Sequence, residues 1–127
     1  TFRKEKIVKI LIVEDNATNQ MLTQAILNQQ GYLSSIASNG KIAIDLLNSE
    51  PFDLILMDLH MPVMDGYEAT EHIRNHMSEA IKNIPIIAVT GAPQSTEEHE
   101  CKKVGMNAYI AKPFKKADLI QTIKHYL

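Results

Sequence analysis

Four charged residues in this 127-residue sequence have the types and positions needed for chemistry at the edge of a β-sheet. Glu14 and Asp15 follow one apolar run, Asp58 ends a second run, and Lys112 follows a third. A charged group at the point where a buried strand ends is held firmly by the fold but still reaches solvent. If these strands lie side by side, three carboxylates and one ammonium group meet at one edge.

Three neighbouring carboxylates repel one another and need a counterion. At about 5 Å and an effective dielectric constant of about 20, each pair costs roughly 3 kcal/mol, so the three cost on the order of 10 kcal/mol. Either a raised pKa or a bound cation relieves this repulsion, and an all-oxygen site favours a hard ion such as Mg2+. A divalent ion together with Lys112 would neutralise the three negative charges.

A magnesium site of this kind is suited to phosphoryl transfer, because Mg2+ prefers one or two carboxylates, several waters and a phosphate oxygen. Asp58 would be the nucleophile, since an aspartate can attack phosphorus and form an acyl phosphate. Lys112 would bind the phosphoryl oxygens, and the hydroxyl of Thr90, which ends the apolar run 85–89, would donate a hydrogen bond to one of them. The residue types therefore cover the charges that the reaction develops.

Length and composition indicate one globular domain over residues 1–127, with an ordered core of about 7–127. The chain is 45% hydrophobic and 22% charged, and a formal net charge of -2 gives no long-range attraction to nucleic acid. No apolar stretch approaches the ~20 residues that cross a bilayer, so we expect no membrane insertion by this domain. A single cysteine suits a reducing compartment, and we expect a cytoplasmic location.

Five apolar runs alternate with segments of helical periodicity, and they lie too far apart for hairpins. The runs are near 8–13, 33–37, 54–57, 84–89 and 108–111. Three of them are almost wholly apolar, which is typical of parallel strands covered on both faces. We therefore predict an α/β fold: a doubly wound, five-stranded parallel sheet in the flavodoxin-like order 2-1-3-4-5, with ligands bound where the first and third strands diverge.

Two helical segments carry specific expectations. An apolar stripe that includes Leu22, Ala25 and Ile26 is predicted to dock the first helix on the sheet. The segment 94–104 is rich in acids and lysines and leaves only Cys101 and Val104 as clear core anchors, so we expect it to be the most weakly attached helix.

Over nearly its whole length the chain resembles a receiver domain of a two-component response regulator. The motifs that carry this resemblance are ILIVEDN at 10–16, DLILMD at 53–58, MP at 61–62, MDG at 64–66, AVT at 88–90 and AKPF at 111–114. The phrasing around these motifs is similar to receivers attached to hybrid sensor histidine kinases. The resemblance implies the same fold and a role in a phosphorelay.

The resemblance also implies roles for the acidic residues. Asp58 would be phosphorylated by a histidine kinase or a histidine phosphotransfer protein that carries a phosphohistidine. Glu14 and Asp15 would hold Mg2+ with Asp58, and the backbone carbonyl of His60 would complete the protein ligands. The domain would catalyse its own phosphorylation and dephosphorylation, although signalling would be its main role.

Further implications concern Lys112 and the switch. Lys112 would pair with the phosphoryl group, and the Lys112–Pro113 peptide bond would be cis. Phosphorylation would draw the Thr90 hydroxyl inward, Tyr109 would fill the vacated space, and the segment 94–104 would move. The family more often has alanine at the position of Gly91, and Pro93 is a second departure that makes the switching behaviour less secure.

Alternatives from other functional classes stay open at this point. A magnesium-dependent phosphohydrolase with an aspartyl nucleophile usually has a second aspartate two positions on, where this chain has His60. The His60 side chain could alter hydrolysis of the acyl phosphate, or could simply be an exposed loop residue. The intact acidic set argues against a phosphorylation-independent interaction module, which a failure to bind magnesium would favour. A dinucleotide-binding domain is excluded, because acids replace the glycine-rich turn after the first strand.

Overall fold

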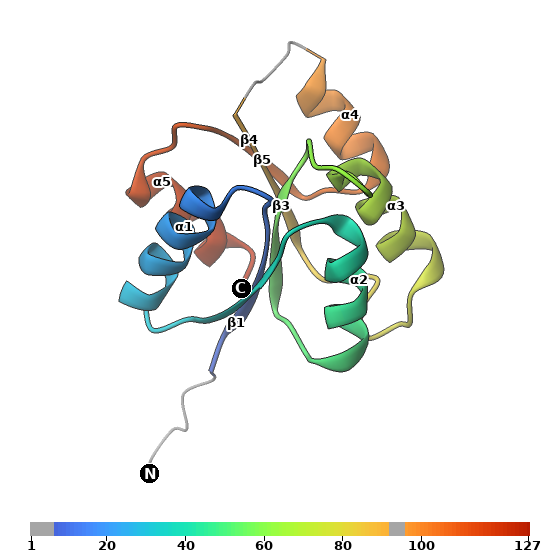
Figure 1. Ribbon diagram of the computed structural model, residues 1–127, viewed down its shortest axis with the longest axis horizontal. Coiled ribbons are helices and arrows are strands. Elements are labelled where there is room, and N and C mark those ends of the chain that lie inside the picture. Colours follow the sequence, from blue (N-terminus) through green and yellow to red (C-terminus); the bar gives the residue numbers. More distant parts are fainter. Residues whose placement is uncertain (1–6, 92–95) are drawn as a thin grey trace.

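Five strand and helix units make up the computed structural model, which describes residues 7–91 and 96–127 (Figure 1). The strands are β1 (Lys9–Val13), β2 (Leu33–Ala37), β3 (Leu54–Asp58), β4 (Ile86–Thr90) and β5 (Ala108–Ala111). The helices are α1 (Ala17–Gln29), α2 (Gly40–Ser49), α3 (Gly66–His76), α4 (Glu97–Val104) and α5 (Lys116–His125). Among these helices none is long and apolar enough to cross a membrane.

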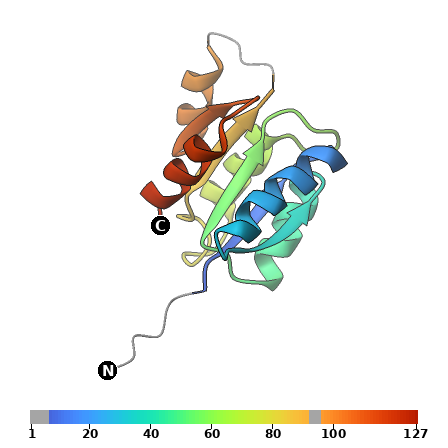
Figure 2. The same cartoon turned by 90° about the vertical axis from the view of Figure 1, so that its left-hand side faces the viewer.

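The strands form one parallel sheet in the order β2-β1-β3-β4-β5, so the predicted fold class is confirmed. Helices α1 and α5 cover one face of the sheet, and α2, α3 and α4 cover the other (Figures 1 and 2). Each face has its own hydrophobic core. Strands β3 and β4 are buried along their whole length because both of their faces are covered.

Local side-chain chemistry fixes where three of the helices begin. Asn16 and Asn39 cap α1 and α2 by accepting a backbone N–H at 2.9 and 3.0 Å. Asp65 and Glu68 form a reciprocal capping box at the start of α3. By contrast, Thr96 precedes α4 without a side-chain cap hydrogen bond. The helices next to the β1 and β3 ends therefore have better-defined first turns than α4 has.

Helix α4 differs from its sequence-based description at one residue. Gln94 and Pro93 lie outside the described residues, and the described helix begins at Glu97. Cys101 is buried as expected, but Glu97 is also buried, with 5% of its surface exposed. The expectation that only Cys101 and Val104 anchor this segment is therefore wrong, because a carboxylate also takes part in the packing.

The apolar stripe predicted for α1 is also wrong in its position. Leu22 is 56% exposed and Ala25 is exposed, whereas Ile26 and Leu27 are buried. The docked face runs through the half-buried Thr23 and then Ile26 and Leu27, a helical i, i+3, i+4 pattern whose first member is polar. A prediction that counts only apolar residues leaves out Thr23, and it therefore places the buried stripe on a face of the helix that is turned toward solvent.

One arginine from α3 joins two loops at the amino ends of β4 and β5. The Arg74 guanidinium donates to the carbonyl oxygens of Lys82 and Ile84 at 2.7 and 2.8 Å, before β4. It also donates to the carbonyl of Gly105 and the side chain of Asn107, both at 2.9 Å, before β5. The planar five-donor group is suited to this arrangement, which fixes the starts of both strands to the same helix.

Candidate functional site

The carboxyl ends of β1 and β3 bring three acids into one cluster. Each of Glu14, Asp15 and Asp58 offers a carboxylate oxygen, and these oxygens all lie within 4.8 Å of one another. Glu14 and Asp58 are buried, with 6% and 8% of their surfaces exposed, whereas Asp15 is exposed to solvent. Three oxygen donors, two held rigidly and one open to water, fit a small hard cation such as Mg2+.

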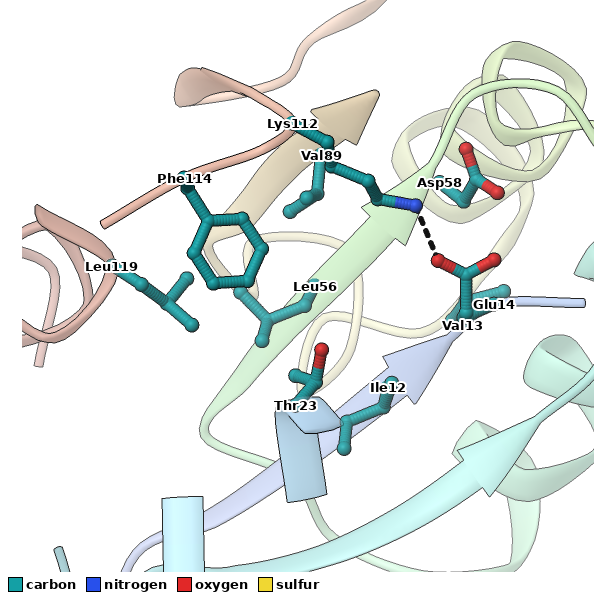
Figure 3. A pocket seen from close by; sticks show the side chains of 10 residues that line it. All are labelled: Ile12, Val13, Glu14, Thr23, Leu56, Asp58, Val89, Lys112, Phe114 and Leu119. Carbon is teal, nitrogen blue, oxygen red and sulfur yellow. Dashed lines mark hydrogen bonds and ion pairs between the residues drawn. The ribbon is translucent and has the colours of Figure 1, made fainter. Parts of the chain in front are cut away.

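Glu14 is held by contacts from four parts of the chain. Its backbone N–H donates to the carbonyl of Ala37 at 2.9 Å, and the Gln20 side-chain amide donates to the Glu14 carbonyl at 2.6 Å. The Asn16 backbone N–H donates to one carboxylate oxygen at 3.2 Å, and the Lys112 ammonium pairs with the other. Figure 3 shows the ammonium directed at this carboxylate with Asp58 beside it.

The pKa values of the two buried acids shift in opposite directions. Burial and the neighbouring Glu14 carboxylate raise the pKa of Asp58 from 3.8 to about 7, although Lys112 opposes the shift. Burial alone would raise the pKa of Glu14 as well, but hydrogen bonds with Lys112, Asp58 and the Asn16 backbone together hold it below its usual value. The pair therefore keeps Glu14 ionised, whereas Asp58 binds a proton more readily than an ordinary aspartate does. A cation that replaced this proton would relieve the same repulsion.

The chain approaches Asp58 so closely from α3 that only glycine fits at the first helical position. A Cβ atom on Gly66 would lie 2.2 Å from the Asp58 carbonyl oxygen. The Gly66 backbone N–H donates to the carbonyl of Leu59 at 3.0 Å, which closes the loop between β3 and α3. The loop carbonyls and the Asp58 carboxylate are thereby held at one edge.

The same loop contains a strained turn. Val63 has a φ of 70°, in the left-handed region that a β-branched residue rarely adopts, and its side chain is 75% exposed. The Met64 backbone N–H donates to the carbonyl of Pro62 at 2.8 Å across this residue, as in a γ-turn. Strain in the backbone therefore lies within five residues of Asp58.

Lys112 and Thr90 meet at the ends of β5 and β4. The Lys112 backbone N–H donates to the Thr90 carbonyl at 2.7 Å, and the Lys112–Pro113 peptide bond is cis. The Thr90 residue is fully buried. A Cβ atom at Gly91 would have its nearest contact at 3.9 Å, with the Lys112 side chain, so the glycine is not required by space.

Two buried hydroxyl groups lie near this edge without partners. Within residues 7–91 and 96–127, neither the Thr90 hydroxyl nor the Tyr109 hydroxyl has a hydrogen-bond partner. Burial raises the pKa of Tyr109, so its hydroxyl stays protonated. An unsatisfied buried hydroxyl is costly, and these two would gain stability from any change that gave them a partner.

The His60 side chain points to α4, which sequence reasoning did not find. Its Nε2 atom lies 2.6 Å from a carboxylate oxygen of Glu97, whose side chain is 6% exposed, while the His60 side chain is 61% exposed. The rings of His60 and Tyr67 also contact each other edge to face, with centroids 6.4 Å apart. His60 and Glu97 are 37 residues apart in sequence, and no local sequence pattern predicts their contact. It links the loop after Asp58 to the first turn of α4.

The charged cluster opens into a pocket whose other wall is mostly apolar. Leu56, Val89, Phe114 and Leu119 line this pocket, together with Thr23 from α1 (Figure 3). Thr23 is the one polar residue among the described residues on that wall of the pocket. The charges are therefore directed at one another and at the open edge of the sheet.

Comparison with known proteins identifies a family with this arrangement. The family model for the response regulator receiver domain matches residues 10–124 of the sequence. Hybrid signal transduction histidine kinase B of Dictyostelium discoideum is 41% identical over 97% of this chain, but the match covers only 7% of that protein. The polar-differentiation response regulator DivK of Brucella anthropi is 36% identical over 93% of this chain and 94% of that protein.

Solved structures that are similar to this chain belong to the same family. The receiver domain of a sensor histidine kinase from Pseudomonas aeruginosa, crystallised with a magnesium ion coordinated in the active site cleft, has a TM-score of 0.86 at 38% identity, over 95% of this chain and 98% of that one. A receiver domain from Saccharomyces cerevisiae, co-crystallised with a histidine phosphotransfer signaling protein, has a TM-score of 0.85 at 27% identity, over 94% and 88%.

Proposed function

The chain belongs to the response regulator receiver domain family of two-component and phosphorelay signalling, and from this premise we propose that Asp58 is its phosphoacceptor. The observation that carries the proposal is the convergence of Glu14, Asp58 and Lys112 at one edge of the sheet. The raised pKa of Asp58 supports it, because perturbed carboxyl groups in such clusters are typical of functional sites.

The proposed reaction is a single transfer between two nucleophiles. A carboxylate oxygen of Asp58 attacks the phosphorus of a phosphohistidine on a histidine kinase or histidine phosphotransfer protein. The new O–P bond forms as the P–N bond breaks, and the imidazole leaves with the electron pair of that bond and takes up a proton. Asp58 must be ionised to attack, and its raised pKa means that a bound cation would increase the ionised fraction.

We propose that Glu14, Asp15, Asp58 and the backbone carbonyl of His60 hold Mg2+ during this transfer. When bound, the ion would supply positive charge that keeps Asp58 ionised and offsets the charge of the phosphoryl oxygens. The Lys112 ammonium, now paired with Glu14, lies close enough to Asp58 to turn toward a phosphoryl oxygen. Glu14 would then exchange one positive partner for another.

The switch proposed here begins at the two unpartnered hydroxyls. A phosphoryl oxygen on Asp58 would give the Thr90 hydroxyl an acceptor, and Tyr109 would move into the space left behind. Helix α4 would respond, because the His60 and Glu97 side chains connect it to the loop after Asp58. A cytoplasmic setting, where such kinases present their phosphohistidine, stays a prediction.

Intact mass after incubation with acetyl phosphate and Mg2+ tests the phosphoacceptor. The parent chain should gain the mass of one phosphoryl group, and Asp58→Asn should gain none. A phosphorylation-independent interaction module would show no gain in either protein. Retained phosphorylation in Asp58→Asn would refute the assignment of Asp58.

Turnover separates the receiver from a phosphohydrolase. A phosphohydrolase would release many equivalents of phosphate per chain, whereas a receiver should accumulate the acyl phosphate first. For the switch, Thr90→Ala should leave phosphorylation largely intact but weaken the conformational response. Amide spectra of this variant that shift as fully as wild type on beryllofluoride addition would refute the role of Thr90.

A further inference from the structure

Helix α3 carries a pair of histidines that the phosphoryl site does not use. His72 and His76 are separated by one helical turn, and their ring centroids lie 5.4 Å apart with an interplanar angle of 40°. His76 is exposed and His72 is half-buried, so solvent reaches both rings. Both residues lie in the last two turns of the helix, away from the loop that follows Asp58.

Imidazole pairs at this spacing on one helix face are a recurring ligand arrangement for zinc. A zinc–nitrogen bond of about 2.0–2.1 Å, extended by about 1.1 Å from the nitrogen to the ring centre, places each ring centre about 3.2 Å from the ion. At a tetrahedral angle the two centres would then lie about 5.2 Å apart, and at a right angle about 4.5 Å. The observed 5.4 Å agrees with the tetrahedral arrangement.

We propose that His72 and His76 form a zinc-binding site on the surface of α3. Rotation of the rings, which is soft for an imidazole side chain, brings one nitrogen of each toward a common point. Two protein ligands leave the other positions of the ion to water. The site is therefore open and exchangeable, unlike a closed structural site with four protein ligands.

The nearest basic residue in sequence, Arg74, is directed away from the pair. Arg74 lies between the two histidines in sequence, but residues two apart on a helix do not share a face. Its guanidinium is held by four acceptors on the loops before β4 and β5. The C-terminal end of a helix also carries a partial negative charge, which favours a cation in the last turn.

The proposed zinc site and the acidic cluster differ in the metals that they select. The acids offer only oxygen, which suits Mg2+, whereas imidazole nitrogen suits zinc and other borderline ions. The only cysteine of the chain, Cys101, is buried in the core and does not compete for the metal. In excess Mg2+, therefore, we expect zinc to favour the histidine pair over the acidic cluster.

Zinc titration in the presence of excess Mg2+ tests the site. Ring resonances of His72 and His76 should shift together, while those of His99 and His125 stay in place. His72→Gln and His76→Gln should each weaken zinc binding by at least about tenfold, because removing one ligand leaves a single imidazole. Zinc should also raise the melting temperature of the parent chain, since it binds only the folded helix, and should not do so in either variant.

Glutamine preserves the helix and a polar side chain, so circular dichroism of the two variants should match the parent. His125→Gln is the matched control and should bind zinc as the parent does. The proposal fails if either single variant retains the parent affinity, or if His125→Gln loses it equally. It also fails if Asp58→Asn abolishes the zinc-induced shifts, because the ion would then occupy the acidic cluster. Unchanged zinc binding in Asp58→Asn supports the site whether or not Asp58 accepts a phosphoryl group.

Discussion

The amino ends of the strands form one edge of the sheet, the amino edge, and their carboxyl ends form the opposite one, the carboxyl edge. Both edges carry acids and a lysine, but the two settings shift the pKa of a carboxyl group in opposite directions. At the amino edge, the Lys9 ammonium pairs with Glu50 and lies 5.2 Å from the centre of the Phe52 ring. The Lys9 backbone N–H donates to Asp53 at 2.9 Å, and the Ser35 hydroxyl donates to Glu50 at 3.3 Å. The bond with Lys9 is the main reason that the pKa of Glu50 lies below its usual value.

At the carboxyl edge the charges do not balance. Three acids share one lysine, and the pKa of Asp58 rises to about 7 where that of Glu50 falls. The two ends of the strands thus separate charges that hold the fold together from charges that are available for chemistry. Charges that are paired within the chain stabilise the fold, whereas the excess of carboxylates at the carboxyl edge can be offset by a bound cation.

The largest contrast should come from replacing the lysine at each edge. Lys112→Ala should lower the rate of phosphorylation by acetyl phosphate about 100-fold, because it removes a cation aimed at the developing charge. Lys9→Ala should leave this rate within about twofold of wild type, since its partners lie at the far edge. Rates from intact mass against time would measure both. Equal losses in the two variants would mean that general destabilisation, not the site, is responsible.

Neutralising one acid at each edge should have effects of opposite sign on stability. Asp58→Asn should raise the free energy of unfolding above neutral pH by about 2 kcal/mol, because it removes a buried charge that repels Glu14. Glu50→Gln should slightly lower it, since that carboxylate is paired. Urea unfolding without divalent ions measures both. A destabilised Asp58→Asn would contradict the view that the carboxyl edge is under repulsion.

The pH dependence of stability should come mainly from the carboxyl edge. With the pKa of Asp58 raised from 3.8 to about 7, the folded chain holds a proton that the unfolded chain has already released between these values. Stability from this group is therefore present below about pH 4 and is lost as the pH rises toward 7. Urea unfolding from pH 4.5 to 7.5 should show this loss in wild type and a smaller one in Asp58→Asn. The same slope in both proteins would locate the titrating group elsewhere.

The smallest contrast concerns backbone strain. The loop after Asp58 places Val63 at a φ of 70°, whereas the turns at the amino edge place Gly31 and Gly105 at their positive φ angles. Val63→Gly should stabilise the chain by about 1 kcal/mol, and Gly31→Ala should destabilise it by a similar amount. Nothing lies within 4 Å of a Cβ atom at Gly31, so only the backbone angle would act there. Thermal unfolding of both variants measures the pair, and a Val63→Gly protein less stable than wild type would rule out strain.

Repeating periodic signals made the fold predictable, and tertiary pairing made part of the site unpredictable. Apolar runs gave five strands and their parallel order, and the residues at their ends, such as Asp58 and Lys112, followed because parallel strands share a carboxyl edge. The acidic character of Glu97 predicted exposure to solvent, whereas the structure buries it in contact with His60, which is distant in sequence. The exposure of Leu22 was missed because Thr23 takes part in the docked face of α1.

The four hydrogen bonds of Arg74 have a mechanical consequence for α4. They hold Gly105, the residue that ends this helix, to α3 and to the start of β4. At the opposite end of the helix, the Thr96 side chain makes no cap hydrogen bond, and Glu97 contacts His60 in the loop after Asp58. A tilt of α4 that preserved the arginine hydrogen bonds would therefore pivot near Gly105 and displace Glu97 farthest.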